Sequence, residues 1–138
     1  MIENLEFNED GIGEGTFLSS FFANEQDDRL WIYIQNKELS DYAEKCIEHF
    51  NSMNDEMIDI ICKGIAESAK QDDFEEEIEN IRDILEYCWF TSLIIGTPKS
   101  NEIEYMVEGE SEWGDCIGFI IRGDNVLYVG NDIYSEEI

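Results

Sequence analysis

A strongly negative net charge, on a chain that still carries enough apolar residues for a core, is the feature that most constrains this sequence. The 138 residues include 34 Asp and Glu against 8 Lys and Arg, for a formal net charge of −26 at pH 7. Hydrophobic residues make up 43% of the chain, with eight Phe, six Tyr and three Trp. Disordered acidic chains lack such residues. The sequence therefore predicts a folded domain whose surface is almost all one sign.

The length fits a single domain over residues 1–138. The first residues have no basic segment followed by a long apolar run, and the apolar runs are far shorter than the ~20 residues of a membrane span. We therefore expect a cytoplasmic protein. Four cysteines stand far apart without a Cys-x-x-Cys pair, which indicates reduced thiols, mostly buried.

The hydrophobic pattern divides the chain into strand, helix and strand regions. Residues 2–36 alternate as β-strands, with Leu30, Ile32 and Ile34 on one face and Trp31 and Tyr33 on the other. Residues 40–90 have helical spacing, residues 91–130 read as β-hairpins, and residues 131–138 form a polar tail. We predict an α+β fold in the order β-β-α-α-α-β-β-β, with three helices on one face of a mainly antiparallel sheet.

Each of the three predicted helices carries an apolar stripe at a spacing of three and four residues. The stripes are Ala43, Cys46, Ile47 and Phe50; Ile58, Ile61, Cys62, Ile65 and Ala69; and Phe74, Ile78, Ile81, Leu85 and Cys88.

A row of glutamates is the most specific candidate site. Side chains in a strand alternate between two faces, so a strand over residues 102–112 places its even-numbered residues on one face. That face would carry five carboxylates, interrupted by Met106: Glu102, Glu104, Glu108, Glu110 and Glu112. Trp113 and Asp115 follow at a predicted turn. The row is either a solvated strand face or a docking surface for a Lys/Arg-rich partner, with Trp113 as an anchor or a buried closing residue.

A second acidic patch lies at the start of the third predicted helix. Its residues are Asp72, Asp73, Glu75, Glu76, Glu77 and Glu79. Negative charge at a helix N-terminus is favoured by the helix dipole, which explains the patch without a partner. Binding through this patch is the alternative.

Motifs for catalysis or metal binding are weak. The glycines from Gly11 to Gly15 do not match a phosphate-binding loop, because a predicted strand follows them and acidic residues surround them. Cys46 and His49 lie on adjacent helical turns, but a zinc site needs two more ligands. His49 is the only histidine, and nothing frames a nucleophile. We therefore predict no enzyme activity, no cofactor and no metal.

Both ends of the chain carry short recognisable segments: residues 5–11 (LEFNEDG) with Phe17, and residues 111–118 (SEWGDCIG) with residues 126–130 (VLYVG). In these segments the chain resembles small acidic α+β immunity proteins of bacterial polymorphic and contact-dependent toxin systems, a group with many domains of unknown function. Such relatives often carry a histidine where this chain has Ile117. The resemblance implies a protein that binds and neutralises a cognate toxin without catalysis. Toxins of this kind are often basic nucleases.

Charge and resemblance lead to one hypothesis with two alternatives. Acidic surfaces repel nucleic acid and anionic lipids, so we expect neither as a partner, whereas a basic protein is favoured. The leading hypothesis is an immunity or inhibitor protein that binds a basic toxin domain. The alternatives are a nucleic-acid mimic that inhibits a DNA-binding protein and a small ligand-binding domain. Acidity that serves only solubility also remains open.

Overall fold

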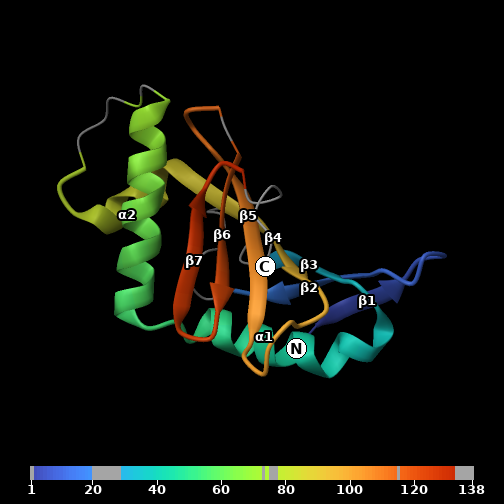
Figure 1. The fold of residues 1–138 in the computed structure, drawn as a ribbon. Helices are drawn as coiled ribbons and strands as arrows, with labels where there is room; N and C mark the ends of the chain where they lie inside the picture. The colour runs from blue at the N-terminus through green and yellow to red at the C-terminus, as the bar shows by residue number, and fades with distance from the viewer. Residues whose placement is uncertain (1, 20–28, 73, 75–77, 115, 133–138) are drawn as a thin grey trace.

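The structure is a computed structural model that describes residues 2–19, 29–72, 74, 78–114 and 116–132. Within these residues the chain forms one seven-stranded sheet whose strands are ordered β1 to β7, the same order as in the sequence (Figure 1). The strands are β1 Glu3–Phe7, β2 Gly13–Leu18, β3 Arg29–Ile34, β4 Cys88–Ile95, β5 Glu104–Ser111, β6 Cys116–Arg122 and β7 Asn125–Gly130. The helices are η1 Lys37–Leu39, α1 Ser40–Asn51, α2 Asp55–Gln71 and η2 Ile81–Tyr87.

One parallel pair joins two antiparallel units. Neighbouring strands are antiparallel from β1 to β3 and again from β4 to β7. Strands β3 and β4 run parallel, with Trp31 opposite Ser92 and Ile34 opposite Ile95. A parallel connection needs a long crossover, and here the crossover holds all the helices of the described residues.

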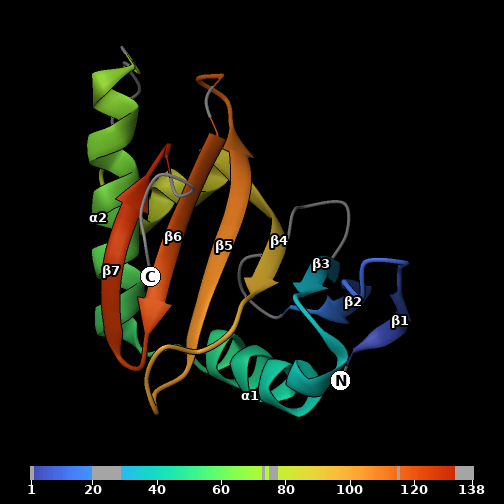
Figure 2. The same cartoon turned by 45° about the vertical axis from the view of Figure 1, so that its right-hand side comes forward.

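A single core lies between the helices and one face of the sheet, which we call the inner face. Alternate strand residues are fully buried there, including Phe17, Ile32 and Val107. Phe50 of α1 packs edge-on against both Phe17 of β2 and Tyr105 of β5, with ring centroids 6.0 and 6.2 Å apart. Figure 2 shows α1 at the foot of the sheet and α2 behind β7. We call the opposite side of the sheet the outer face.

The α+β class and the mainly antiparallel sheet are confirmed, as are the hairpin that turns at Gly123 and the strand over residues 30–34. Helices α1 and α2 bury the stripe residues predicted for the first two helices. The predicted order had two strands before the helices and three after them, whereas the described residues hold three and four. None of the helices in the described part is long and apolar enough to cross a membrane.

The third predicted helix is wrong in type and length. The structure has a short 3₁₀ helix, η2, which begins after Asn80. The Asn80 side chain caps its N-terminus, and Asp83 reaches back to the Asn80 backbone. At Cys88 the chain changes to strand β4, because its β-branched and aromatic residues suit a sheet. Phe74 and Ile78 still pack on the core, so the apolar residues were identified correctly without the helix.

The close contact of β4 with β5 at Gly109 gives a test of the fold. A Cβ at Gly109 would overlap the carbonyl oxygen of Trp89 and lie 2.8 Å from the Cα of Phe90. These are backbone atoms of β4, so Gly109→Ala has to push two central strands apart. We expect urea unfolding to show a loss of about 3 kcal/mol.

Gly96→Ala is the matched control, because the nearest atom to its new Cβ is Gln35 Oε1 at 3.7 Å. We expect it to change the free energy of unfolding by no more than about 0.5 kcal/mol. Equal stabilities of the two variants would contradict the pairing of β4 with β5.

Candidate protein-binding face

The outer face of the sheet combines aromatic rings with carboxylates. In β2 and β3 the residues between the buried ones include Glu14, Trp31 and Tyr33, and Trp31 is 47% exposed. In β4 and β5 they include Trp89, Glu108 and Glu110. We call these six residues the acidic–aromatic face: Glu14, Trp31, Tyr33, Trp89, Glu108 and Glu110.

Strand register brings these residues together from distant parts of the sequence. Trp31 lies opposite Ser92, and Ser92 lies opposite Glu108, so β3, β4 and β5 form one cross-strand row. Glu14 is paired with Tyr33 in the next row. Residues two apart on one strand are about 6.8 Å apart, so Glu108 and Glu110 are neighbours on this face.

Tyr33 lies within the influence of carboxylates from two other strands. Its pKa is raised, first by partial burial and then by the negative charges of Glu14 and Glu108. A hydrogen bond from Ser92 opposes this shift of the pKa. Trp89 donates its indole Nε1–H to Glu110 at 3.2 Å. Aromatic rings are thus held beside carboxylates at two places on the same face, which is the arrangement that a cationic side chain with an apolar stem would fit.

The predicted row of five exposed glutamates is only partly present. Strand β5 covers residues 104–111, so Glu102 and Glu112 lie outside it, and both are exposed. Glu108 is half-buried and Glu110 exposed, as members of the outer face. Glu104 is the main correction, since it is only 4% exposed. A regular ladder of five solvated carboxylates is therefore absent from this strand.

Glu104 is buried because it has a cation and several hydrogen-bond donors around it. Arg122 of β6 donates its Nε–H to the Glu104 carboxylate at 2.9 Å, and Ser100 Oγ donates to the same oxygen at 2.8 Å. The Glu104 backbone N–H donates to Tyr42 of α1 at 2.7 Å. Breaking a buried ion pair by changing one partner destabilises the fold, because the other charge is left buried and unpaired. Glu104→Lys would therefore test folding and not partner binding.

The other predicted site residues lie apart from the acidic–aromatic face. Trp113 is half-buried and packs beside Phe74, with ring centroids 5.1 Å apart, so it helps to close the core. Asp115 lies outside the described residues. Of the second acidic patch, Asp72 is the C-cap of α2 and Glu79 is exposed. Asp73, Glu75, Glu76 and Glu77 also lie outside the described residues. Helix η2, which stands in place of the third predicted helix, begins at Ile81, so Asp72 is not at its N-terminus, whereas Glu79 directly precedes its N-cap Asn80.

His49 connects α1 to two parts of the sheet. Its Nδ1 lies 2.7 Å from the Tyr105 hydroxyl, and its Nε2 lies 3.6 Å from the carboxylate of Asp124 in the β6–β7 turn. Tyr105 is 1% exposed, and burial raises its pKa well above the ordinary value. Both ring nitrogens thus have partners that join structural elements. The sulfur of Cys46 instead faces the Glu104 carbonyl oxygen at 3.7 Å. Within the described residues, no group of three His, Cys, Asp or Glu side chains could hold a metal ion.

Burial of three thiols predicts how stability depends on pH. Burial raises the pKa of Cys46 and Cys88 to about 12 and that of Cys62 to about 11. An unfolded thiol has a pKa of about 8.5, so above that pH the unfolded chain releases protons that the folded chain retains. We expect urea titrations under reducing conditions to show constant stability up to pH 8. Above that pH, the stability should fall by up to about 1.4 kcal/mol per pH unit for each thiol.

Cys62→Ala removes one of the buried thiols, so it should make this pH dependence shallower. A free energy of unfolding that stays constant from pH 8 to pH 10 would contradict the burial of these thiols.

Sequence reasoning placed Trp31 and Tyr33 together on one face of their strand but missed their meeting with Glu108. Alternation within one strand shows which residues share a face, whereas the register between strands shows which of them touch. Comparisons with curated proteins and with solved structures gave no significant match. A family described as a domain of unknown function, DUF6985, matches residues 1–134. The chain therefore belongs to the DUF6985 family.

Proposed function

We propose that this protein is a non-catalytic inhibitor of the immunity type, which binds a basic protein through the acidic–aromatic face. The single observation behind the proposal is the meeting of Trp31, Tyr33 and Trp89 with three carboxylates on the side of the sheet that α1 and α2 do not cover. Aromatic residues dominate binding energy in protein interfaces, and complementary charge raises the rate of encounter.

The charge of the whole chain supports a cationic partner. A net charge of −26 creates a repulsive field around the protein, which opposes self-association and attracts positively charged surfaces. The cations that the structure places on the outer face are already paired, Arg29 with Glu3 and Arg122 with Glu104. The net potential of the acidic–aromatic face is therefore negative.

A basic toxin domain, such as a nuclease, is the partner class that best fits this field and the resemblance of the two terminal segments to immunity proteins. A nuclease binds phosphates through a cationic groove. A protein that covers this groove with carboxylates and aromatic rings would exclude the nucleic acid. No catalytic role is assigned to this chain, because both ring nitrogens of His49 already contact structural partners.

Charge reversal on the acidic–aromatic face tests the proposal. The partner is first captured from an extract of the native host at low salt and identified by mass spectrometry. Its dissociation constant is then measured for the wild type and for a double variant, Glu108→Lys with Glu110→Lys. We expect affinity to fall by about 30-fold, because two close charge pairs become repulsive. Added wild-type protein should also inhibit the activity of the partner.

The matched control is Glu48→Lys with Glu86→Lys, which changes the net charge by the same amount. Both residues are exposed and lie on α1 and η2, away from the outer face. We expect this control to weaken binding less than threefold. An equal loss in both double variants would show that net charge alone drives binding. Competition by duplex DNA for the captured partner would show whether the two bind the same groove.

A further inference from the structure

Strand β7 is the last strand of the sheet, and a groove lies beside its unpaired edge. An edge strand has a row of backbone N–H and C=O groups that its single neighbour does not use. Strand β7 pairs with β6 on one side only, in the described part of the chain. The opposite edge, β1, is interrupted by an irregularity between Glu3 and Glu6, and Asn4 has a φ of 57°. The β6–β7 pair has an irregularity of its own, between Ile120 and Ile121, so what distinguishes β7 from β1 is the groove between β7 and α2.

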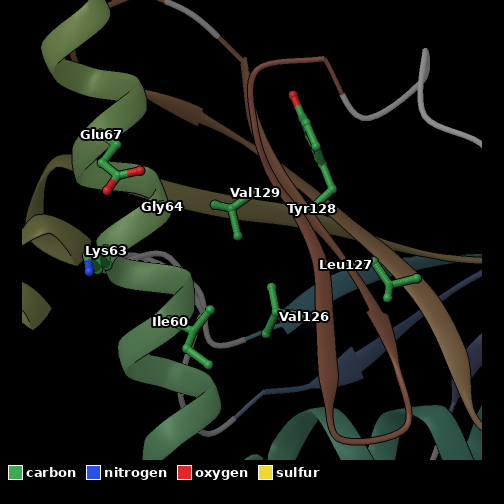
Figure 3. A pocket seen from close by; sticks show the side chains of 8 residues that line it. All are labelled: Ile60, Lys63, Gly64, Glu67, Val126, Leu127, Tyr128 and Val129. Atoms are coloured by element: carbon green, nitrogen blue, oxygen red, sulfur yellow. The ribbon is translucent and has the colours of Figure 1, made fainter.

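Helix α2 meets this edge at Gly64. A Cβ at Gly64 would lie 2.6 Å from the Cβ of Val129, so glycine allows the helix and the strand to touch there. An open cavity of about 400 Å³ lies between the two elements here. The residues that line it are Ile60, Lys63, Gly64 and Glu67 of α2, and Val126, Leu127, Tyr128 and Val129 of β7 (Figure 3). We call this cavity the α2–β7 groove.

Large apolar side chains are exposed on α2 beside the α2–β7 groove and on the side of β7 that faces away from α2. Ile60 is 47% exposed and Leu127 is 46% exposed, although both are large hydrophobic residues. Figure 3 shows Val126 and Val129 directed toward α2, and Leu127 directed away from it. A strand added beside β7 would cover Ile60 with the side chains that point to the helices. It would also form backbone hydrogen bonds with the unpaired edge of β7. One added strand would therefore both cover Ile60 and pair this edge.

Charge decides between the two kinds of strand that could add to this edge. A second copy of this chain would bring another net charge of −26 to the same edge, and the two copies would repel. A cationic segment is attracted by the same field, and Glu67 provides a carboxylate within the groove. Lys63 opposes a cation on the side that faces the helix, so residues there should be apolar.

We propose that the α2–β7 groove accepts an extended segment of the basic partner as an eighth strand, with apolar side chains toward Ile60 and cationic side chains on the alternate positions. The partner's identity rests on the proposed function, whereas the strand site does not, because none of the residues that line the α2–β7 groove belongs to the acidic–aromatic face. The two ideas can therefore fail separately.

A nine-residue peptide that alternates valine and lysine is the probe. Two control peptides have the same side chains, but each carries N-methyl groups on one alternate set of backbone nitrogens. One set faces β7 and the other faces away. At physiological salt we expect the parent peptide and one control to bind, and the other control to lose binding by at least tenfold. Amide hydrogen exchange should slow at least tenfold along β7.

Two single substitutions of exposed isoleucines locate the site. Ile60→Ser should weaken binding of the parent peptide by at least tenfold, whereas Ile12→Ser, at a residue 41% exposed near β1 and β2, should change it less than twofold. The double variant Glu108→Lys with Glu110→Lys should bind the peptide within threefold of the wild type. Loss of peptide binding in that variant would move the site to the acidic–aromatic face.

Equal binding of all three peptides would show attraction by charge alone and would overturn the strand site. Protection of β1 instead of β7 would do the same. Failure of the peptide to bind would remove the eighth strand but would leave the charge-reversal experiment on the acidic–aromatic face unaffected.

Discussion

The parallel pairing of β3 with β4 is the interaction on which the rest of this structure depends. It joins residues more than 50 positions apart, and closing a loop of that length costs conformational entropy. Burial of the inner residues of the pair offsets this cost, because Ile32, Ile34, Leu93 and Ile95 are all at most 1% exposed. Hydrogen bonds continue beyond the strands, where Gln35 donates its backbone N–H to Ile95 and its side chain accepts from Thr97.

This pairing also creates the acidic–aromatic face. Without it, Trp31 and Tyr33 would belong to a three-stranded unit, and Glu108 and Glu110 to a four-stranded one. The inner face of the joined sheet packs against the helices and forms the core. The outer face, which α1 and α2 do not cover, collects exposed aromatic rings and carboxylates. Concentrated negative charge destabilises a compact state, and a cationic partner would relieve that repulsion.

Local patterns in the sequence were sufficient for α1, α2 and the β6–β7 hairpin, because each depends on neighbours within a few residues. Helical spacing also identified Phe74, Ile78 and Ile81 as core residues, but it could not show that Asn80 and Asp83 would start a separate 3₁₀ helix. The alternation around Trp31 was correct. What was missed depends on contacts between strands that are distant in sequence.

Glu104 illustrates this limit most clearly. The even-numbered pattern correctly grouped it with Glu108 and Glu110, on the side of β5 opposite Val107. Its burial, however, depends on Arg122 being opposite it in β6 and on Tyr42 reaching it from α1. A pattern along one strand contains no information on either neighbour. The candidate binding surface is therefore not a linear row of glutamates on one strand but a face that spans four strands.

The most direct test of this division between the two faces is to measure stability and partner affinity together on Trp31→Thr. Threonine keeps the β propensity of this strand, and Trp31 is 47% exposed. The account predicts a free energy of unfolding within about 1 kcal/mol of the wild type. It also predicts a dissociation constant for the captured basic partner that is raised by about 30-fold or more. Unchanged affinity, or a loss of affinity explained by unfolding, would contradict it.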